Sequence, residues 1–472
     1  MATKKDLVEA YSFSRRRLVT AFISGAPGGR EVEPARPGRT IVGGLALAVL
    51  LIAGAAIAGI FAPRAPDDWA SQGLVLSKED GNAYVILEDE GDPVLRPVIN
   101  ITSAKLILGA DSEPRSVPQE EIDERVVGDD IGIFGAPATV PSASLLIPTG
   151  WTACTDEDRG VRVTITEQPG VDPDVRGAFV VLHEGRYYVI AVSGKEDDQE
   201  PRGYSYLLPK DASARDNILD ELGLVSAADS AVEVGEEWLT LFPEGADLEL
   251  ASFGLEGLGT TPAKRGEGTG IPDDAVIGNV LESSGDYYVV TLEGPMPLTD
   301  FAAAVYRNLP EQPSEVAAEG PLEARPESTY SGNHWPTDLP HLIDQAPCAV
   351  LHAEEDQPPA VVPGSLVDEQ PDVPAPASSV VAGQKDQGVQ PGHGAYVLSG
   401  SFTDSDEGLP FLIDAKGKAY TLVGSDAADL LGYGSAEHPV VPDEWVELFE
   451  PGVPLSRDAA LCRPREDPDA TC

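Results

Sequence analysis

The sequence has few basic residues. Its 472 residues include 32 Lys and Arg against 79 Asp and Glu, which gives a formal net charge of −47 at pH 7. Such a negative field repels nucleic-acid phosphates and anionic lipid head groups, because proteins bind those surfaces through Lys and Arg. The composition therefore argues against a nucleic-acid-binding protein and favours a protein or a cell-envelope polymer as the partner.

Long apolar runs are absent, with one exception. Residues Ile41–Ala62 form a run of 22 residues without a charge, IVGGLALAVLLIAGAAIAGIFA. At about 1.5 Å per residue, a helix of this length crosses a hydrocarbon core of about 30 Å. A cleaved signal peptide has an apolar region of only about 7 to 15 residues. We therefore expect one uncleaved transmembrane helix.

The charges on either side of this run predict the topology. Residues 1–40 hold eight Lys and Arg and four Asp and Glu, a net charge of +4, so the rest of the chain carries −51. Basic residues stay on the cytoplasmic side of a span. We expect a cytoplasmic N-terminus, a single-pass inner-membrane protein, and a periplasmic bulk after residue 62.

Cysteine is also scarce, and all four cysteines follow the apolar run: Cys154, Cys348, Cys462 and Cys472. Their spacings match no zinc-ligand set, so no metal site is expected. An outer, oxidising compartment favours disulfides. Three pairings are possible, and we favour Cys154 with Cys348 and Cys462 with Cys472, because the last two share a short terminal tail.

Glycine and proline, in contrast, are abundant. The 48 Gly and 42 Pro exceed their usual combined share of about 12%, which favours many short elements joined by turns. Hydrophobic residues make up 42% of the chain, enough to bury cores. A protein of long helices is not expected.

Two tryptophan segments reveal an internal repeat. Residues Glu237–Leu248 read EWLTLFPEGADL and residues Glu444–Leu455 read EWVELFEPGVPL, with six identical positions. The matches include Trp238 with Trp445 and Gly245 with Gly452. Because each Trp lies in an apolar W-x-x-L-F segment, we expect both to be core residues of their repeat.

Each copy is expected to contain a strand and a helix before the Trp. The strand is RYYVIAV from Arg186 in one copy and AYVLSGS from Ala395 in the other. Asp211 or Ser213 and Ser425 are candidate N-caps of the helices. Two further copies, which start with DYYVVTL at residue 286 and NAYVILED at residue 82, lack the Trp.

A period of roughly 70 to 110 residues is too long for a solenoid and predicts four small α+β modules. Segments 138–176 and 331–353 match no copy, and each holds one internal cysteine; if these cysteines pair, the two segments form a central element. We expect Pro-rich residues 354–392 and Pro310–Pro326 to be exposed connectors.

The predicted divisions of the chain follow from these features. They are 1–40 (cytoplasmic), 41–62 (span), 69–137, 177–250, 276–330 and 393–456 (repeats 1 to 4, the third with its linker), 251–275 (connector) and 457–472 (tail).

Several strings resemble one family. They are GNAYVILEDEGDPVLRPVINITSAKLILG from Gly81, GIFGAPATVP from Gly132, WTAC from Trp151, GIPDDAVIGNVL from Gly270, WVELFEPGVPLSRDAAL from Trp445 and EAYSFSRRRLVTAF from Glu9. In this order they resemble EccB, the membrane component of actinobacterial type VII (ESX) secretion systems. The resemblance spans nearly the whole chain.

The resemblance implies a β-rich α+β fold: one N-terminal transmembrane helix and an elongated outer region of four repeat domains around a central β domain. It also implies a disulfide at the positions of Cys154 and Cys348. The family is a structural part of a ring-shaped complex that also contains the ATPase EccC, the membrane subunits EccD and EccE, and a mycosin protease. Its repeats are similar to a phage-lysin unit, which suggests peptidoglycan as a ligand.

We expect the N-terminal segment Glu9–Phe22 to dock onto a partner subunit. Tyr11, Leu18 and Phe22 recur at helical spacing, and the basic Arg15, Arg16 and Arg17 lie between them. A helix on the anionic inner leaflet has a similar pattern. The leading hypothesis is a scaffold subunit of a secretion channel; the alternative is a membrane-tethered peptidoglycan-binding protein acting alone.

The sequence contains little that predicts catalysis or a cofactor. Family members are labelled ATPases, but the two Gly-Lys pairs, Gly194-Lys195 and Gly417-Lys418, do not complete a P-loop. No zinc-protease or nucleophile-elbow motif occurs. We interpret His183 and His352, each near carboxylates, as isolated surface residues, and the acidic string from Asp404 to Gly408 as a solvated turn. We expect no catalytic, cofactor or metal residues.

Overall fold

A computed structural model describes residues 3–24, 42–52, 65–66, 68–88, 93–193, 200–228, 230–266, 269–322, 333–367 and 380–465. The chain divides into two units, Met1–Ala65 and Pro66–Cys472.

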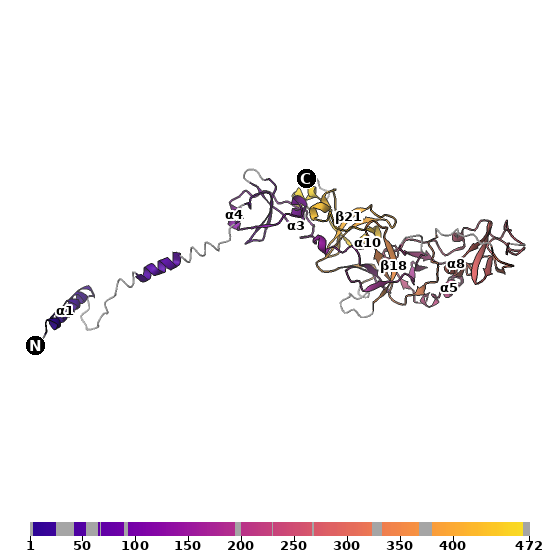
Figure 1. The fold of residues 1–472 in the computed structure, drawn as a ribbon, viewed down its shortest axis with the longest axis horizontal. Helices are drawn as coiled ribbons and strands as arrows, with labels where there is room; N and C mark the ends of the chain where they lie inside the picture. Colours follow the sequence, from indigo (N-terminus) through magenta and orange to yellow (C-terminus); the bar gives the residue numbers. More distant parts are fainter. Residues whose placement is uncertain are drawn as a thin grey trace. The chain divides into compact units, whose positions relative to one another are not determined.

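The first unit contains helix α1 (Lys4–Ser24) and a second helix of residues 42–52 (Figure 1). At the start of α1, the backbone N–H of Thr3 donates to Asp6 Oδ2 at 2.9 Å, which satisfies one of the unpaired groups at a helix N-terminus. Half of the expected span Ile41–Ala62, residues 41 and 53–62, lies outside the described residues. Within the described residues, no helix is both long enough and apolar enough to cross a membrane.

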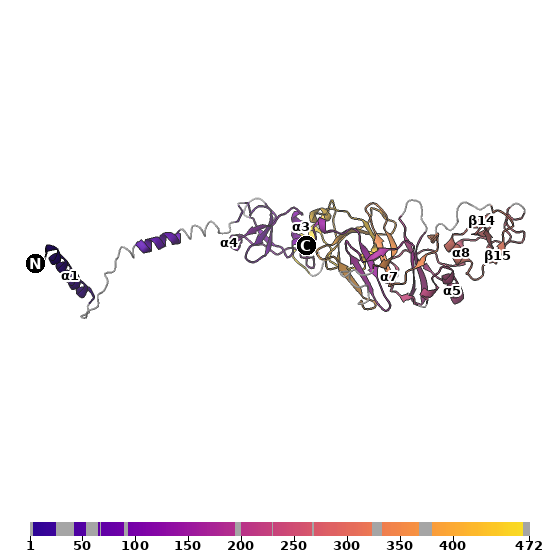
Figure 2. The same ribbon diagram turned by 60° about the horizontal axis from the view of Figure 1, so that its bottom comes forward.

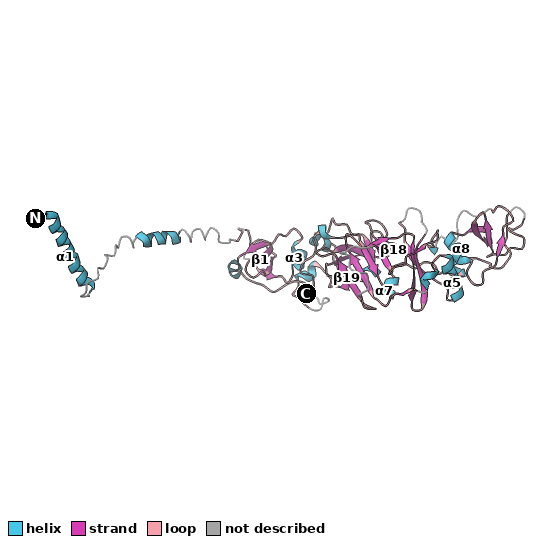
Figure 3. Ribbon diagram, turned by 90° about the horizontal axis from the view of Figure 1, so that it is seen from below, coloured by secondary structure: helices cyan, strands magenta, loops and turns pink. Residues whose placement is uncertain are grey.

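The second unit is rich in strands, with short helices between them (Figure 3). Four of its sheets share one topology: three antiparallel strands, a helix, and a fourth strand parallel to the first. We call them modules 1 to 4 in chain order. A mixed α+β, sheet-rich fold is therefore confirmed.

The modules have these elements. Module 1 has β1 (Gly73–Ser77), β2 (Ala83–Ile86), β3 (Leu95–Pro97), α3 (Ile101–Leu108) and β4 (Arg115–Val117). Module 2 has β8 (Gly177–His183), β9 (Arg186–Val192), β10 (Gly203–Leu207), α5 (Ala212–Glu221), α6 (Val225–Ala228) and β11 (Val232–Glu233). Module 3 has β12 (Val280–Ser283), β13 (Asp286–Thr291), β14 (Gly294–Pro297), α8 (Asp300–Tyr306) and β15 (Glu315–Ala317). Module 4 has β20 (Ala395–Gly400), β21 (Leu409–Ile413), β22 (Lys418–Thr421), α9 (Ala427–Leu431) and β23 (Val440–Pro442).

The expected equivalence of the strands at Arg186 and Ala395 is wrong. The strand at Arg186 is β9, the second strand of module 2, whereas the strand at Ala395 is β20, the first strand of module 4. All three strands of the antiparallel part are apolar, so this composition does not identify the position of a strand. Of the candidate N-caps, Asp211 accepts from the Ala214 N–H of α5. The N-cap position of α9 is Asp426 and not Ser425, and the Asp426 side chain makes no capping hydrogen bond.

A fifth, central sheet has the strand order β19-β6-β5-β17-β18-β7. Its strands are β5 (Trp151–Cys154), β6 (Val161–Ile165), β7 (Val171–Pro173), β17 (Cys348–His352), β18 (Ala360–Leu366) and β19 (Lys385–Val389). The two segments expected to meet do so, because β5 pairs with β17.

The two Pro-rich connectors are only partly as expected. Strands β18 and β19 lie within residues 354–392, and β15 lies within Pro310–Pro326. The prolines dominate the composition of the longer segment and conceal the apolar β18, whose first five residues are buried. Its Pro363 carbonyl accepts from the Asp174 N–H at 2.8 Å, so proline does not exclude this segment from the sheet.

Neighbouring modules share hydrophobic cores. One core joins modules 1 and 4, where α3 packs against α9, and another joins modules 2 and 3, where α5 packs against α8. A third joins the central sheet to modules 2 and 4. The contacts therefore follow the order module 1, module 4, central sheet, module 2, module 3, which Figure 2 shows from α3 to β14.

Further short elements complete this unit: α4 (Gln119–Asp123), η1 (Ala143–Leu145), α7 (Glu236–Leu239), η2 (Leu250–Phe253), β16 (His341–Leu342), α10 (Asp443–Val446), β24 (Glu450–Pro451) and α11 (Arg457–Leu461). Strand β16 adds to the sheet of module 2 and β24 to that of module 4.

Candidate functional site

The two repeat tryptophans meet at the central sheet. Trp238 on α7 and Trp445 on α10 are both fully buried. Trp238 Nε1 donates to the Ala153 carbonyl of β5 at 3.1 Å, and Trp445 Nε1 donates to the Leu241 carbonyl at 3.4 Å. Each indole N–H thus finds a partner outside its own module or segment, as most buried Trp side chains do.

This arrangement refines the expected role of the two side chains. Both are buried, but they belong to one core that modules 2 and 4 share with the central sheet, rather than to a separate core in each repeat. Aromatic contacts support the shared core: Trp151 of β5 packs edge-on against Phe449 of module 4 at 5.5 Å between centroids. The sequence contained one indication of this shared core: only two of the four copies carry the Trp.

The repeated glycines of the Trp segments also have a physical reason. A Cβ atom at Gly245 would lie 2.3 Å from Tyr206 Cε1, and one at Gly452 would lie 2.3 Å from Tyr420 Cδ1. In both modules, the segment after the Trp runs beside the third strand and under its tyrosine ring. Only glycine allows the backbone to approach the ring this closely.

The central sheet carries a disulfide between Cys154 and Cys348. The two residues are register partners on β5 and β17, and their relative exposures are 6% and 0%. This is the pairing favoured from the sequence. Cys462 is also disulfide-bonded, and Cys472, its expected partner, lies outside the described residues.

The expected docking residues lie on α1. Tyr11, Leu18 and Phe22 are 74%, 70% and 93% exposed, and Arg15, Arg16 and Arg17 are exposed as well. At 100° per residue, the three apolar side chains lie on one side of the helix, next to Arg15. The helix thus presents an apolar stripe with a cationic border, suited to an apolar groove with acidic residues at its edge.

His183 and His352, the histidines that lie near carboxylates in the sequence, make no contacts with the described part of the chain that indicate catalysis. His183 Nδ1 lies 2.9 Å from the Val234 carbonyl. Burial lowers the pKa of His352, while Glu200 and Glu354 act in the opposite direction. Among the described residues, no group of three or more His, Cys, Asp and Glu is placed to hold a metal ion.

The acidic string after β20 forms a turn. Asp404 Oδ2 accepts from the Ser401 N–H at 2.7 Å. This backbone hydrogen bond, together with one from the Ser401 side chain, lowers the pKa of the Asp404 carboxyl. The carboxylate is therefore used to close the turn, as such residues commonly are.

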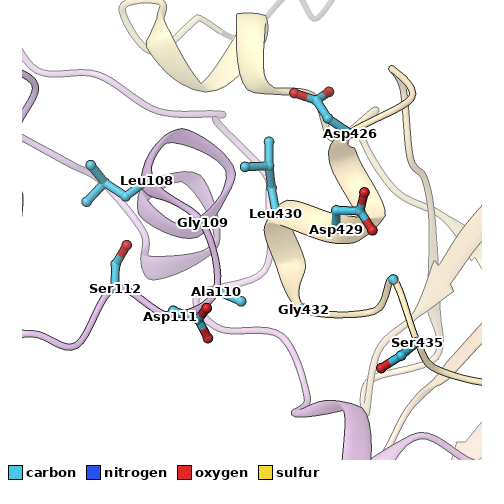
Figure 4. Close-up of a pocket in the computed structure, with 11 residues that line it drawn as sticks. Leu108, Gly109, Ala110, Asp111, Ser112, Asp426, Asp429, Leu430, Gly432 and Ser435 are labelled. Atoms are coloured by element: carbon cyan, nitrogen blue, oxygen red, sulfur yellow. The ribbon is translucent and has the colours of Figure 1, made fainter.

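One hollow of about 580 Å³ lies between the ends of α3 and α9 (Figure 4). Its acidic side chains are Asp111, Asp426 and Asp429, and the other lining residues are Leu108, Gly109, Ala110, Ser112, Leu430, Gly432, Gly434 and Ser435. The C-terminal ends of both helices add negative potential. None of its described lining residues is a His, Cys, Lys or Arg, so the lining offers an anion no cationic side chain.

Comparison with known proteins identifies the family. The family model described as "Type VII secretion system ESX-1, transport TM domain B" matches residues 1–465. The chain belongs to the EccB family of type VII secretion proteins. The resemblance recognised in the sequence is thereby confirmed.

Relatives and solved structures agree with this assignment. The EccB-family chain is 27% identical to the ESX-1 secretion system ATPase EccB1 of Mycolicibacterium smegmatis, over 90% of this chain and 87% of the relative. It is 26% identical to EccB1 of Mycobacterium tuberculosis, over 97% and 94%. The fold matches a chain of an intact ESX-5 inner membrane complex with a TM-score of 0.60 (21% identity, 100% and 97% covered). It also matches the EccB3 dimer of the ESX-3 core complex with a TM-score of 0.59 (20% identity, 83% and 100% covered).

Proposed function

We propose that this EccB-family protein is a structural membrane subunit of a type VII (ESX) secretion complex and scaffolds the channel on its outer side. The family match over residues 1–465 is the observation that carries this proposal. The match in fold to a chain of an ESX-5 inner membrane complex supports it.

In the proposed topology, residues 1–40 are cytoplasmic, Ile41–Ala62 spans the inner membrane, and residues 66–472 lie in the periplasm. The net charge of +4 before the apolar run supports this orientation. The disulfide in the outer unit also supports it, because disulfides persist in an oxidising compartment. An impermeant maleimide should label Ser401→Cys but not Ser12→Cys on intact cells; the reverse pattern would overturn the topology.

The four modules are, in this proposal, repeats of one unit around a central β domain. Their common strand order supports this view, as do the matching Trp segments of modules 2 and 4. The central domain then includes β18 and β19 in addition to the two segments expected from the sequence.

The proposed partners divide between the two sides of the membrane. Helix α1 docks onto the EccC-like ATPase and the EccD-like subunit through its exposed apolar stripe and Arg15–Arg17. An EccE-like subunit and a mycosin protease belong to the same assembly, and outer modules of several copies associate in a ring. The solved EccB3 of the ESX-3 core complex is a dimer, which supports self-association.

We propose that the protein does not itself hydrolyse ATP, although relatives are named ATPases. Lys418, the lysine of the Gly417-Lys418 pair, begins β22 of a hairpin, and its Nζ lies 3.4 Å from Glu450 Oε1. A phosphate-binding Lys instead follows a glycine-rich loop that opens a helix. The other pair, Gly194-Lys195, lies outside the described residues.

Affinity purification of the tagged full chain from detergent-solubilised membranes tests the scaffold role. We expect EccC-like and EccD-like subunits to be recovered with it. Recovery of the protein alone, together with its co-sedimentation with purified peptidoglycan, would instead support the peptidoglycan-binding alternative.

A further inference from the structure

The outer unit begins with a short segment, residues 66–72, that precedes β1 and of which Pro66 and residues 68–72 are described. Two backbone hydrogen bonds fold its described residues into a turn: the Trp69 N–H donates to the Pro66 carbonyl at 3.1 Å, and the Ser71 N–H donates to the Asp68 carbonyl at 3.0 Å. A free peptide of this length does not hold such a turn, because each ordered residue costs about 1–2 kcal/mol of conformational entropy. Contacts with module 1 must therefore stabilise it.

One side chain of module 1 holds the backbone of this segment. Arg115 on β4 donates from Nη1 to the carbonyls of Asp68 and Ser71, at 3.2 and 3.0 Å, and from Nη2 to that of Gln72 at 3.2 Å. The guanidinium is a rigid, planar group with several N–H donors, so it can hold three carbonyls in one geometry. A lysine ammonium does not offer this arrangement.

The second contact is made by the segment's own tryptophan. Trp69 is only 6% exposed, and the guanidinium carbon of Arg125 lies 5.5 Å from the centroid of its ring. An arginine over an indole ring is attracted by the negative face of the ring. Trp69 therefore contributes apolar burial, whereas Arg115 contributes directed hydrogen bonds.

We propose that Trp69 and Arg115 form an anchor that fastens the start of the outer unit to module 1. The chain then leaves this unit at Pro66 and not at Gly73, where β1 begins. Release of the seven residues 66–72 would lengthen the free chain by up to about 25 Å, at about 3.5 Å per residue. The anchor therefore limits how far module 1 can move from the membrane. This inference depends on the proposed span.

Hydrogen exchange on the full chain in detergent tests the anchor itself. In Arg115→Ala and in Trp69→Ala, we expect the amides of Trp69 and Ser71 to exchange at least tenfold faster, while the amides of β2 and β13 are unchanged. Arg115→Lys should resemble Arg115→Ala and serves as the milder variant if the alanine variant loses the sheet. The exposed Lys78 provides the matched control, and Lys78→Ala should behave as wild type. Unchanged exchange at both amides in Arg115→Lys and Trp69→Ala would overturn the proposal.

Energy transfer in nanodiscs tests the consequence. With a donor dye on Glu113→Cys and an acceptor in the lipid, Arg115→Lys should give lower and more variable transfer than wild type or Lys78→Ala. Identical transfer in all variants would show that the anchor does not limit the distance. If the wild-type chain fails to insert into the nanodisc, the proposed span is wrong, whereas the exchange experiment still decides the anchor.

Discussion

Cys154 on β5 lies directly opposite Cys348 on β17, and their disulfide joins two residues 194 positions apart in the chain. Modules 2 and 3 lie entirely between these two residues, whereas modules 1 and 4 lie outside them. The disulfide thus closes a chain loop that contains β6 and β7 of the central sheet together with all of modules 2 and 3.

Replacement of both cysteines by serine should loosen the attachment of modules 2 and 3 more than it unfolds either module. In the chain-entropy model, a disulfide that closes a loop this long contributes up to about 5 kcal/mol. Hydrogen exchange should rise mainly in β5, β17 and β18. An equal rise throughout β12–β15 would contradict this expectation, and peptide mapping without reduction checks the pairing in the wild type.

Trp445→Ala should destabilise the shared core and not module 4 alone. Truncation of a fully buried Trp costs about 3–5 kcal/mol. We expect a lower denaturation midpoint and faster exchange in β5 and β6 of the central sheet. Phe134→Ala, at a side chain that is 55% exposed, is the control with little expected effect. Faster exchange restricted to β20–β23 would contradict a shared core.

Gly452→Ala should destabilise module 4, because the added Cβ would lie 2.3 Å from Tyr420 Cδ1. Such overpacking typically costs about 1–3 kcal/mol. Gly320→Ala is the matched control, since a Cβ there meets no atom within 4 Å. Equal unfolding midpoints for the two variants would show that the contact with the ring does not constrain this position.

Glu444→Gln should stabilise the protein at neutral pH. Burial raises the pKa of Glu444; a backbone hydrogen bond opposes this effect, and the neighbouring Asp443 and Glu447 add to it. A carboxyl with a raised pKa in the folded state is penalised when ionised, so its cost appears above its unfolded-state pKa and disappears in acid. The melting temperature of the variant should therefore exceed that of the wild type at pH 7. The difference should vanish as the pH falls below the usual glutamate range. A difference that persists in acid would have another origin.

Charge reversal of Arg15, Arg16 and Arg17 to glutamate should release the EccC-like and EccD-like subunits from a pull-down of the tagged protein. The protein itself should remain in the membrane fraction. Reversal of Lys4 and Lys5 in the same helix is the matched control for a general charge effect. Full recovery of the complex with the triple variant would show that these arginines serve only to orient the chain.

The sequence predicted the elements that depend on nearby residues. Capping chemistry predicts the helix N-cap at Asp211. Local composition predicts the apolar strands around Arg186 and Asp286. The pairing of Cys154 with Cys348 was favoured because Cys462 and Cys472 are close in the chain. The family resemblance supplied the rest of the outline.

Other features could not be predicted, because they depend on partners far away in the chain. Strand β18 is held by β17 and β7, and its Pro363 made the segment resemble a connector. The position of a strand within its module is set by its pairing, which composition does not reveal. Likewise, the repeat relates the segments of Trp445 and Leu241 but does not show that they touch, and no pattern relates Arg115 to Asp68.

The packing of module 1 against module 4 determines where the outer unit can be labelled. Helix α11 packs on α3, and the Gly132 N–H donates to the Cys462 carbonyl at 3.0 Å, so residue 462 returns to the module where the unit begins. A fluorescent protein fused after the tail would therefore report on the surroundings of module 1. A probe for the opposite end of the unit has to be inserted in module 3, for example in the β13–β14 hairpin at Leu292, which is 46% exposed. Cross-linking and imaging of the assembled complex need both positions to determine its orientation.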